Sequence, residues 1–298
     1  MQTSAAVSCW FILNICIGNL NGLILKKHGF GYPVFLTVVH MVCCWALSGL
    51  SLVFFMRPLD PLPASTHAIK KVRRLSVAFC ASVACGNIAL SYIYVSFAQM
   101  VTAASPLFTI LLMYTMAGKR YSTAAYASMI PMCGGVMLCT AGELNFNLIG
   151  FIAVVSSTLL RGVKSIIQGR LLTAPEDKFD SLTLLHHLSR SSILPLGTYS
   201  ALFEYQAVND PLLTGSSAVK LWSLILVSGL VAFFLNLMNF LVTKYTSAVT
   251  LQVLGNVKVV ISIAISLLIF GNQVSSWSTA GCIITLAGVA AYNNAPKV

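Results

Sequence analysis

The stretch TLQVLGNVKVVISIAISLLIF, residues 250–270, places a lysine inside an apolar run that is long enough to cross a lipid bilayer. A membrane-spanning helix needs about 20 mostly apolar residues, and Lys258 lies near the middle of this run, with no acidic residue close to it in the sequence. A charged side chain at the centre of a bilayer costs about 3 kcal/mol or more. We therefore expect Lys258 to face a polar cavity, because snorkelling to the membrane surface is hardest from this depth.

Apolar runs of similar length recur along the whole chain of 298 residues, of which 57% are hydrophobic and 8% are charged. A soluble domain carries about 25% charged residues, so this composition excludes an ordinary soluble protein. The net charge of +11 does not indicate nucleic acid as a partner, because a nucleic-acid-binding protein needs a wet basic face. The sequence predicts an all-α, polytopic membrane protein with ten transmembrane helices at residues 4–24, 32–56, 75–95, 99–117, 122–141, 147–169, 182–203, 219–242, 246–270 and 276–293.

Lysine and arginine residues outside these runs are divided unequally between the two sides of the predicted membrane. With ten spans, the side that carries both termini has eleven of them and the other side has three. Cytosolic loops carry the excess of basic residues in membrane proteins, so we expect both termini in the cytosol. The densest basic cluster lies between Arg57 and Arg74, which we predict to be a hydrophilic connection between the second and third helices.

The two halves of the sequence match weakly at an offset of 153 positions, at which Gly118 falls on Gly271 and Gly135 falls on Gly288. Residues 1–142 and 143–298 are therefore predicted to be two five-helix repeats of one integral membrane domain. Because each repeat has an odd number of spans, the second enters the membrane from the opposite face. Inverted repeats around a site at the midplane are typical of secondary transporters.

Four basic residues fall inside predicted spans and away from the span ends, whereas all seven acidic residues fall in loops or at helix ends. The four are Arg161, Lys164, Arg190 and Lys258. Phosphate groups complement such cations, because arginine binds them through paired hydrogen bonds and lysine binds them as a point charge. Snorkelling is the alternative for Arg161 and Lys164, which share one helix face, and contact with backbone carbonyls is the alternative for Arg190. We expect exchange of one anion for another, without proton coupling through a membrane carboxylate.

Several motifs, in order along nearly the whole chain, resemble one family of transporters. They are GFGYPVFLTVVHM (29–41), FCASVACGNIALSYIYVSFAQ (79–99), LRGVKSIIQGRLLT (160–173), FFLNLMNFLVTK (233–244) and the run from residue 240 to 275. With them, the chain resembles the triose-phosphate-transporter-like proteins of plants and algae, a group that includes the nucleotide-sugar transporters of the drug/metabolite transporter superfamily. This resemblance also implies ten helices in two inverted halves.

The same resemblance implies a substrate class. Plastid sugar-phosphate translocators carry a Lys-Arg pair in the ninth helix, where this chain has Lys258 followed by Val259. Lysine followed by a small apolar residue is similar to the endomembrane branch that moves UDP-sugars. The implied function is an antiporter of the Golgi or the ER membrane that exchanges a nucleotide sugar, with UDP-sugars favoured, for a nucleoside monophosphate. The alternative is an exchanger of sugar phosphates of the triose-phosphate or phosphoenolpyruvate type.

Candidate substrate contacts come from the cations and from amides and hydroxyls inside the spans. The run FFLNLM, residues 233–238, is similar to a pattern that contacts the nucleotide in GDP-mannose carriers. An amide in a membrane helix needs partners, which either a base edge or a neighbouring helix supplies. Asn256 alternatively holds the start of the ninth helix in place. We predict phosphate contacts from Lys258, Lys164 and Arg161, and nucleotide or sugar contacts from Asn236, Asn239, Asn256, Gln99, Thr102 and Ser105.

Other functional classes have little support in the sequence. A membrane enzyme that acts on lipid-linked sugars needs interfacial acids or histidines, and the chain offers the pair His186-His187 and loop acids. The nine cysteines are scattered without metal-ligand spacing, so we expect no metal and no other cofactor. Expected partners are membrane lipid and the small anionic substrates. A GxxxG motif at Gly18 and Gly22 is compatible with a homodimer.

Overall fold

In a computed structural model, the chain folds into helices. The structure describes residues 2–55, 66–93, 98, 101–140, 147–174, 178–215, 218–258 and 276–296, and this part of the chain contains no β-strand. Within it, five helices are long and apolar enough to cross a membrane, namely Thr3–Leu25, Pro33–Phe54, Ile69–Tyr92, Leu148–Thr173 and Ala218–Tyr245. The prediction of an all-helical protein with several apolar, membrane-length helices is therefore confirmed.

The chain divides into two compact units, and each unit is built from both halves of the sequence. Met1–Cys80 and Ile167–Thr246 form the first unit, and Ala81–Ile166 and Ser247–Val298 form the second. Two long helices, α3 (Thr66–Tyr92) and α7 (Leu148–Thr173), contribute residues to both units. The predicted repeats, 1–142 and 143–298, are sequence halves with equivalent folds, whereas the two units are defined by which residues pack together. The division into units therefore does not test the repeats, and they stay a prediction.

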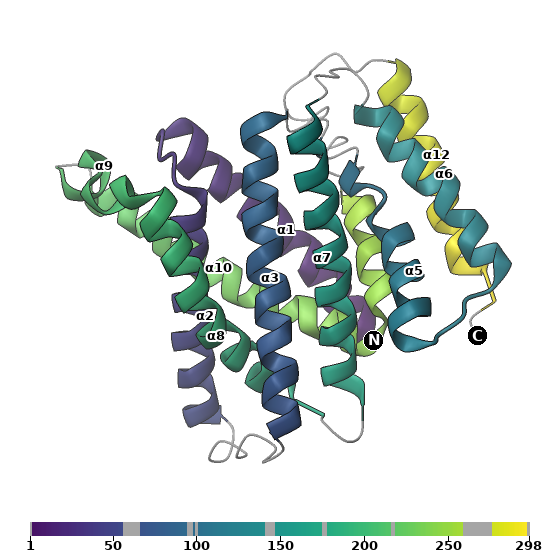
Figure 1. Ribbon diagram of the computed structural model, residues 1–298, viewed down its shortest axis with the longest axis horizontal. Helices are drawn as coiled ribbons and strands as arrows, with labels where there is room; N and C mark the ends of the chain where they lie inside the picture. Colours follow the sequence, from purple (N-terminus) through teal and green to yellow (C-terminus); the bar gives the residue numbers. More distant parts are fainter. Residues whose placement is uncertain are drawn as a thin grey trace. The chain divides into compact units, whose positions relative to one another are not determined.

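The first unit is a helical bundle in which α2 packs against α8, and α10 packs against both α1 and α2 (Figure 1). A buried apolar cluster at one end includes Phe30, Leu36 and Leu213. The elements of this unit, besides its parts of α3 and α7, are α1 (Gln2–Gly22), the π-helix η1 (Leu23–Lys27), α2 (Pro33–Phe55), α8 (Ser181–Phe203), the 3-10 helix η3 (Tyr205–Asn209), α9 (Pro211–Thr214) and α10 (Ala218–Tyr245).

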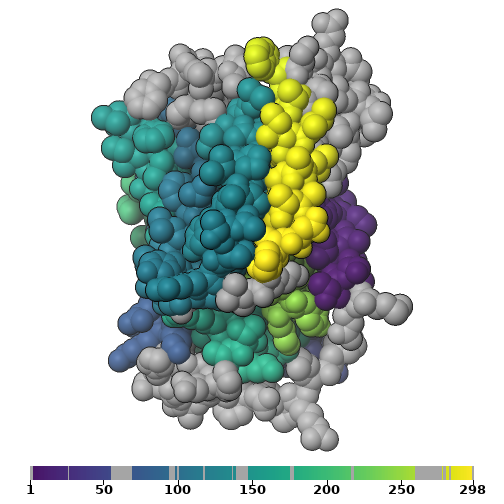
Figure 2. Space-filling view, turned by 90° about the vertical axis from the view of Figure 1, so that its right-hand side faces the viewer, coloured from purple at the N-terminus to yellow at the C-terminus, as the bar shows by residue number. Residues whose placement is uncertain are grey.

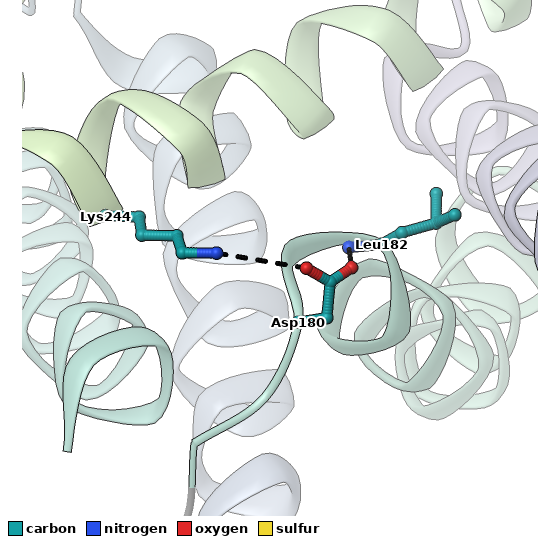
Figure 3. Close-up of polar contacts among 3 residues, drawn as sticks. All are labelled: Asp180, Leu182 and Lys244. Atoms are coloured by element: carbon teal, nitrogen blue, oxygen red, sulfur yellow. Dashed lines mark hydrogen bonds and ion pairs between the residues drawn. The ribbon is translucent and has the colours of Figure 1, made fainter. Parts of the chain in front are cut away.

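Carboxylates hold the two ends of the first unit together. At the end of α8, the Glu204 carboxylate accepts hydrogen bonds from the backbone N–H groups of Val34 (3.0 Å) and Phe35 (2.7 Å) at the start of α2. At the start of α8, Asp180 accepts from the N–H of Leu182 and forms an ion pair with Lys244 at 3.9 Å (Figure 3). The loops at each end of α8 thus meet the loops that the sequence predicts on the same side of the membrane, and which side faces the cytosol stays a prediction.

The second unit contains α5 (Ser105–Ala117), α6 (Thr123–Thr140), a helix over residues 248–258 and α12 (Ser276–Asn294), together with parts of α3 and α7. α12 packs along α6, and the space-filling view shows α12 in yellow against teal α6 (Figure 2). Met129, Met132 and Val253 lie in the buried core of this unit.

The contact between α6 and α12 repeats itself with the partners exchanged. Gly135 faces Thr285, and Met132 faces Gly288. Because the residue number rises along one helix as it falls along the other, α6 and α12 run antiparallel at this crossing. Adding 153 to the number of Gly135 gives Gly288, and subtracting 153 from the number of Thr285 gives Met132, so the first pair is converted into the second. The same offset of 153 positions relates the two halves of the sequence. A two-fold relation between the helices produces such a self-complementary contact.

The described helix boundaries lie within four residues of the predicted spans except at two positions, and the end of the span predicted at 246–270 lies outside the described residues. α3 begins at Thr66, so the basic cluster 70–74 is helical instead of belonging to a connection. Lysine and arginine favour helices, and the buried side chains of Val72 (4% exposed) and Leu75 (0%) give this turn an inner face. The span predicted at 99–117 is interrupted by a turn at residues 103–104, after the helical residues 101–102, and α5 begins at Ser105 with Pro106 in its first turn.

Candidate functional site

Four polar side chains lie along one stripe of α7. Arg161, Lys164, Ser165 and Gln168 are spaced by three, four and seven residues from the first, and this spacing places them on one face of a helix. The division between the two units falls within this stripe, so that Arg161, Lys164 and Ser165 belong to the second unit and Gln168 belongs to the first.

Arg161 is positioned by close packing between α7 and α3. One turn before it, Ser157 donates a hydrogen bond from its hydroxyl to the carbonyl of Ser82, at 2.7 Å. A Cβ at Gly86, one turn further along α3, would lie 3.2 Å from Oγ of Ser157 and 3.6 Å from Nη2 of Arg161. Gly86 therefore lets Ser157 of α7 pack closely on α3, with the guanidinium of Arg161 in van der Waals range of this position.

The helix that carries Lys258 is fixed by two amides. Gln252 donates from Nε2 to the hydroxyl of Ser165 at 2.9 Å and accepts from the hydroxyl of Ser105 at 3.3 Å, so it bridges α7 and α5. Asn256 is buried and donates to the carbonyl of Ala103 at 2.9 Å. These hydrogen bonds fix the position of residues 248–258 against both neighbours, two residues before Lys258.

The three cations predicted to bind phosphate come together in the second unit. The charge of Arg161 acts on both Lys164 and Lys258. The arginine side chain is exposed and the two lysines are partly exposed. Because like charges in a low-dielectric site repel one another, an anion that joins the cluster relieves this repulsion.

The described carboxylates have other partners. Asp180 and Glu204 hold helix ends in the first unit, and Asp210 accepts from the backbone N–H of Leu212 at the start of α9. Partial burial, together with the charge of Asp210, raises the pKa of Tyr32 in the loop before α2. These acids therefore act at the ends of helices, as their positions in the sequence predict.

The amides of α10 belong to the first unit. Asn236 and Asn239 are partly exposed and lie on one face of the helix, three residues apart. Asn236 donates to the carbonyl of Ala232 at 2.9 Å, and Asn239 accepts from the indole N–H of Trp10 at 2.5 Å. The backbone carbonyl of Asn239 also accepts hydrogen bonds, from the side chains of Thr243 and Gln168.

The candidate site thus combines cations on α7, a lysine on the helix after α10 and an amide pair on α10. The chain that carries these residues matches one family along almost its full length. The pattern of the Triose-phosphate Transporter family matches residues 1–293. The chain belongs to the triose-phosphate transporter family.

Two relatives and one solved structure extend this result. The chain is 39% identical to UDP-uronic acid transporter 1 of Arabidopsis thaliana, over 99% of this chain and 95% of that one. It is also 39% identical to an Arabidopsis thaliana protein named "Probable sugar phosphate/phosphate translocator", over 99% of this chain and 83% of that one. A crystal structure superimposes with a TM-score of 0.71 at 16% identity, over 97% of this chain and 96% of that one, and it supports the fold alone.

The structure shows where the predicted site residues of this triose-phosphate transporter family member lie, and their contact with substrate stays a prediction. The second unit contains four of the predicted residues, Lys258, Lys164, Arg161 and Ser105. Thr102, three residues before Ser105, is partly exposed. Gln99 lies outside the described residues. The bond from Asn256 to Ala103 supports the alternative that Asn256 holds its helix in place, and its contact with substrate stays a prediction.

Two residues of the site were missed by sequence reasoning. Gln252 stands in the quoted run TLQVLGNVK, and an amide one to two turns before a membrane lysine was the available signal. Trp10 gave no signal, because its partner Asn239 is 229 positions away in the sequence. The histidine pair of α8, His186 and His187, belongs to the first unit, whereas the cation cluster belongs to the second. Nδ1 of His186 forms a hydrogen bond with the hydroxyl of Ser48 at 3.2 Å.

Proposed function

We propose that this protein is a secondary antiporter that exchanges a nucleotide sugar, in particular a UDP-sugar, for a nucleoside monophosphate across the Golgi membrane. The single observation that carries the proposal is the cluster of Arg161, Lys164 and Lys258 in the second unit. Membership of a transporter family supports transport over catalysis. Identity to a UDP-uronic acid transporter over nearly the whole of both chains supports a UDP-sugar as cargo.

The cations have distinct roles in this proposal. Arg161 binds phosphate oxygens through a planar pair of N–H donors, whereas Lys164 and Lys258 supply compact charges with three rotatable donors each. Sugar transfer from a nucleotide sugar releases a nucleoside diphosphate, hydrolysis of which gives inorganic phosphate and the nucleoside monophosphate, and the monophosphate that returns still carries a phosphate group for the cations to bind. A cluster that binds the same anionic group in both directions therefore favours exchange over one-way transport.

The ten-helix arrangement in two inverted repeats belongs to the same proposal. The self-complementary contact between α6 and α12 supports it, because helices at equivalent places in the two halves pack antiparallel about a two-fold relation. Such a plan is common among transporters that bind substrate near the membrane midplane.

The decisive experiment uses proteoliposomes preloaded with UMP. Lys258→Ala is expected to reduce uptake of a labelled UDP-sugar to background, while the matched control Lys220→Ala, an exposed lysine at the start of α10, retains wild-type uptake. Uptake by Lys258→Ala equal to that of the wild type would refute the assignment of this lysine to the phosphate groups.

The coupling and the alternative cargo are tested in the same system. Uptake should require a nucleotide inside the vesicle and should not respond to a pH gradient, because the proposal includes no proton carrier. Competition by nucleoside monophosphates, but not by phosphoenolpyruvate or triose phosphate, is expected. Competition by the sugar phosphates alone would instead favour the sugar-phosphate exchange that the second relative's name describes.

A further inference from the structure

We propose that Trp10 is a positioning residue that fixes the amide of Asn239 so that its N–H donors face the nucleotide base, and that this orientation makes the protein prefer uracil to cytosine. The inference rests on the proposed function and on the predicted contact of Asn236 and Asn239 of α10 with the nucleotide. It concerns contacts within the first unit, where Trp10 of α1 packs against α10.

The orientation of the Asn239 amide follows from the chemistry of its partner. The Trp10 side chain is 4% exposed, and its Nε1 lies 2.5 Å from Oδ1 of Asn239. An indole nitrogen can only donate a hydrogen bond, so the oxygen of the amide must be the atom that faces it. The Nδ2 group of Asn239, with two donors, therefore points away from Trp10.

The backbone carbonyl of Asn239 is held by separate hydrogen bonds. Gln168, which is 1% exposed, donates from Nε2 to the hydroxyl of Thr243 at 2.7 Å and to the carbonyl of Asn239 at 3.4 Å. The Thr243 hydroxyl donates to the same carbonyl at 2.7 Å. With the backbone fixed by these bonds, rotation of the side chain is the freedom that Asn239 retains, and Trp10 removes it.

Asn236 presents the opposite polarity one helical turn earlier. Its Nδ2 donates to the carbonyl of Ala232 at 2.9 Å and to the sulfur of Cys44 at 3.8 Å. A backbone carbonyl can only accept, so Nδ2 is the atom on that side and Oδ1 is left as an acceptor. Among the described residues, neither Oδ1 of Asn236 nor Nδ2 of Asn239 has another hydrogen-bond partner.

This face of α10 thus offers an acceptor from Asn236 and a donor from Asn239. Uracil presents an N3–H donor beside the O4 acceptor, whereas cytosine presents a bare N3 beside the N4 amino group. If the Nδ2 donor of Asn239 faces position 4 of the base, it donates to O4 of uracil. In cytosine it meets the N4 amino group, which is also a donor. A site whose polar groups stay unpaired with the wrong ligand rejects that ligand strongly, so the fixed amide discriminates between the two bases.

The experiment compares UMP and CMP as competitors of labelled UDP-sugar uptake into proteoliposomes preloaded with UMP. For the wild type, half-inhibition should need about tenfold more CMP than UMP, the effect expected from one hydrogen bond. In Trp10→Phe, which keeps an aromatic ring but lacks the N–H, the amide can turn, and the ratio should fall toward one.

Trp222→Phe is the matched control, because it removes an indole hydrogen bond to the carbonyl of Leu213 elsewhere in the first unit. It should leave the ratio of CMP to UMP unchanged. Asn239→Asp supplies a second measurement that does not require loss of Trp10. The carboxylate still accepts from the indole but presents an acceptor to the base, so cytosine gains a contact through its N4 amino group, uracil loses one at O4, and the ratio should fall toward one.

The outcomes separate this inference from the proposed function. Wild-type protein that shows no nucleotide-dependent uptake overturns both. Wild-type uptake without preference for UMP, or a ratio that is unchanged in Trp10→Phe or in Asn239→Asp, overturns the role of Trp10 alone, and would make its bond with Asn239 a structural contact.

Discussion

Gly135 and Gly288 occupy equivalent places on the two sides of one helix crossing. A Cβ on Gly135 would lie 2.5 Å from Oγ1 of Thr285, and a Cβ on Gly288 would lie 2.5 Å from the backbone nitrogen of Met132. Glycine at both places lets the backbones of α6 and α12 approach more closely than side chains allow, as small residues do in packed membrane helices. The crossing therefore depends on two residues that the sequence offset pairs with each other.

Gly288→Ala should destabilise the protein strongly. The added methyl group meets the backbone of Met132, which cannot move aside as a flexible side chain can, and overpacking of this kind costs about 1–3 kcal/mol. The measurement is the midpoint of thermal unfolding in detergent. Gly134→Ala is the control, because a Cβ at that position meets nothing within 4 Å. Equal midpoints for the two variants would contradict the close crossing.

A second stability prediction concerns the Glu204 carboxylate at the start of α2. It satisfies two N–H groups that the first turn of a helix leaves without partners, at 2.7 and 3.0 Å. Glu204→Ala should lower the free energy of unfolding by about 1–3 kcal/mol. Glu204→Gln keeps an acceptor oxygen, so its free energy of unfolding should lie between those of the wild type and Glu204→Ala.

The ion pair of Lys244 and Asp180 provides the contrast to Glu204. Its side chains are 27% and 43% exposed and 3.9 Å apart, and exposed pairs contribute about 0–1 kcal/mol. Lys244→Met should therefore change the unfolding midpoint less than Glu204→Ala does. The reverse order would show that charge pairing, rather than helix capping, holds the ends of this unit.

The membrane helices could be predicted from the sequence because hydropathy records burial in lipid directly. The start of α3 could not, since the basic residues 70–74 look like a connection, and their helical state depends on the tertiary burial of Val72 and Leu75. The cations of the candidate site could be proposed from the sequence because a charge inside an apolar run stands out. Gln252 and Trp10 could not, because their importance comes from partners distant in sequence.

Tyr121, in the loop between α5 and α6, should be replaceable by phenylalanine with a gain in stability. Its hydroxyl is buried without a hydrogen-bond partner among the described residues, whereas its ring packs on the core of the second unit. Removing an unsatisfied buried hydroxyl is worth about 1–3 kcal/mol. Tyr121→Phe should therefore raise the unfolding midpoint, and Tyr126→Phe, in which the ring is 37% exposed, should leave it nearly unchanged.

The advantage of Tyr121→Phe should grow in alkaline solution. Burial, with smaller effects from Tyr292 and Tyr126, raises the pKa of Tyr121 from 10.0 to about 12. The unfolded chain then releases the proton first, so the wild type loses stability as the pH rises from about 10 to about 12. The phenylalanine variant lacks this loss, and a difference between the two midpoints that does not increase with pH would count against the burial of the hydroxyl.

Gln252 offers a way to separate the architecture of the cation cluster from its charge. Gln252→Leu removes both hydrogen bonds and leaves the hydroxyls of Ser105 and Ser165, each 4% exposed, without this partner. We expect a loss of about 1–3 kcal/mol in the free energy of unfolding, together with a higher KM for the nucleotide sugar as α7 and the helix at 248–258 lose their bridge. Both are measured on one preparation, by thermal unfolding and by initial uptake rates.

Gln252→Glu should dissociate these two effects. Both serine hydroxyls can donate to a carboxylate, so the bridge and the unfolding midpoint are retained. The new negative charge lies beside the α7 face that carries Lys164, where it competes with phosphate for the cations. KM should therefore rise by about tenfold or more, which corresponds to 1.4 kcal/mol of binding free energy, without loss of stability. Wild-type KM in this variant would place the phosphate groups away from the face that Gln252 supports.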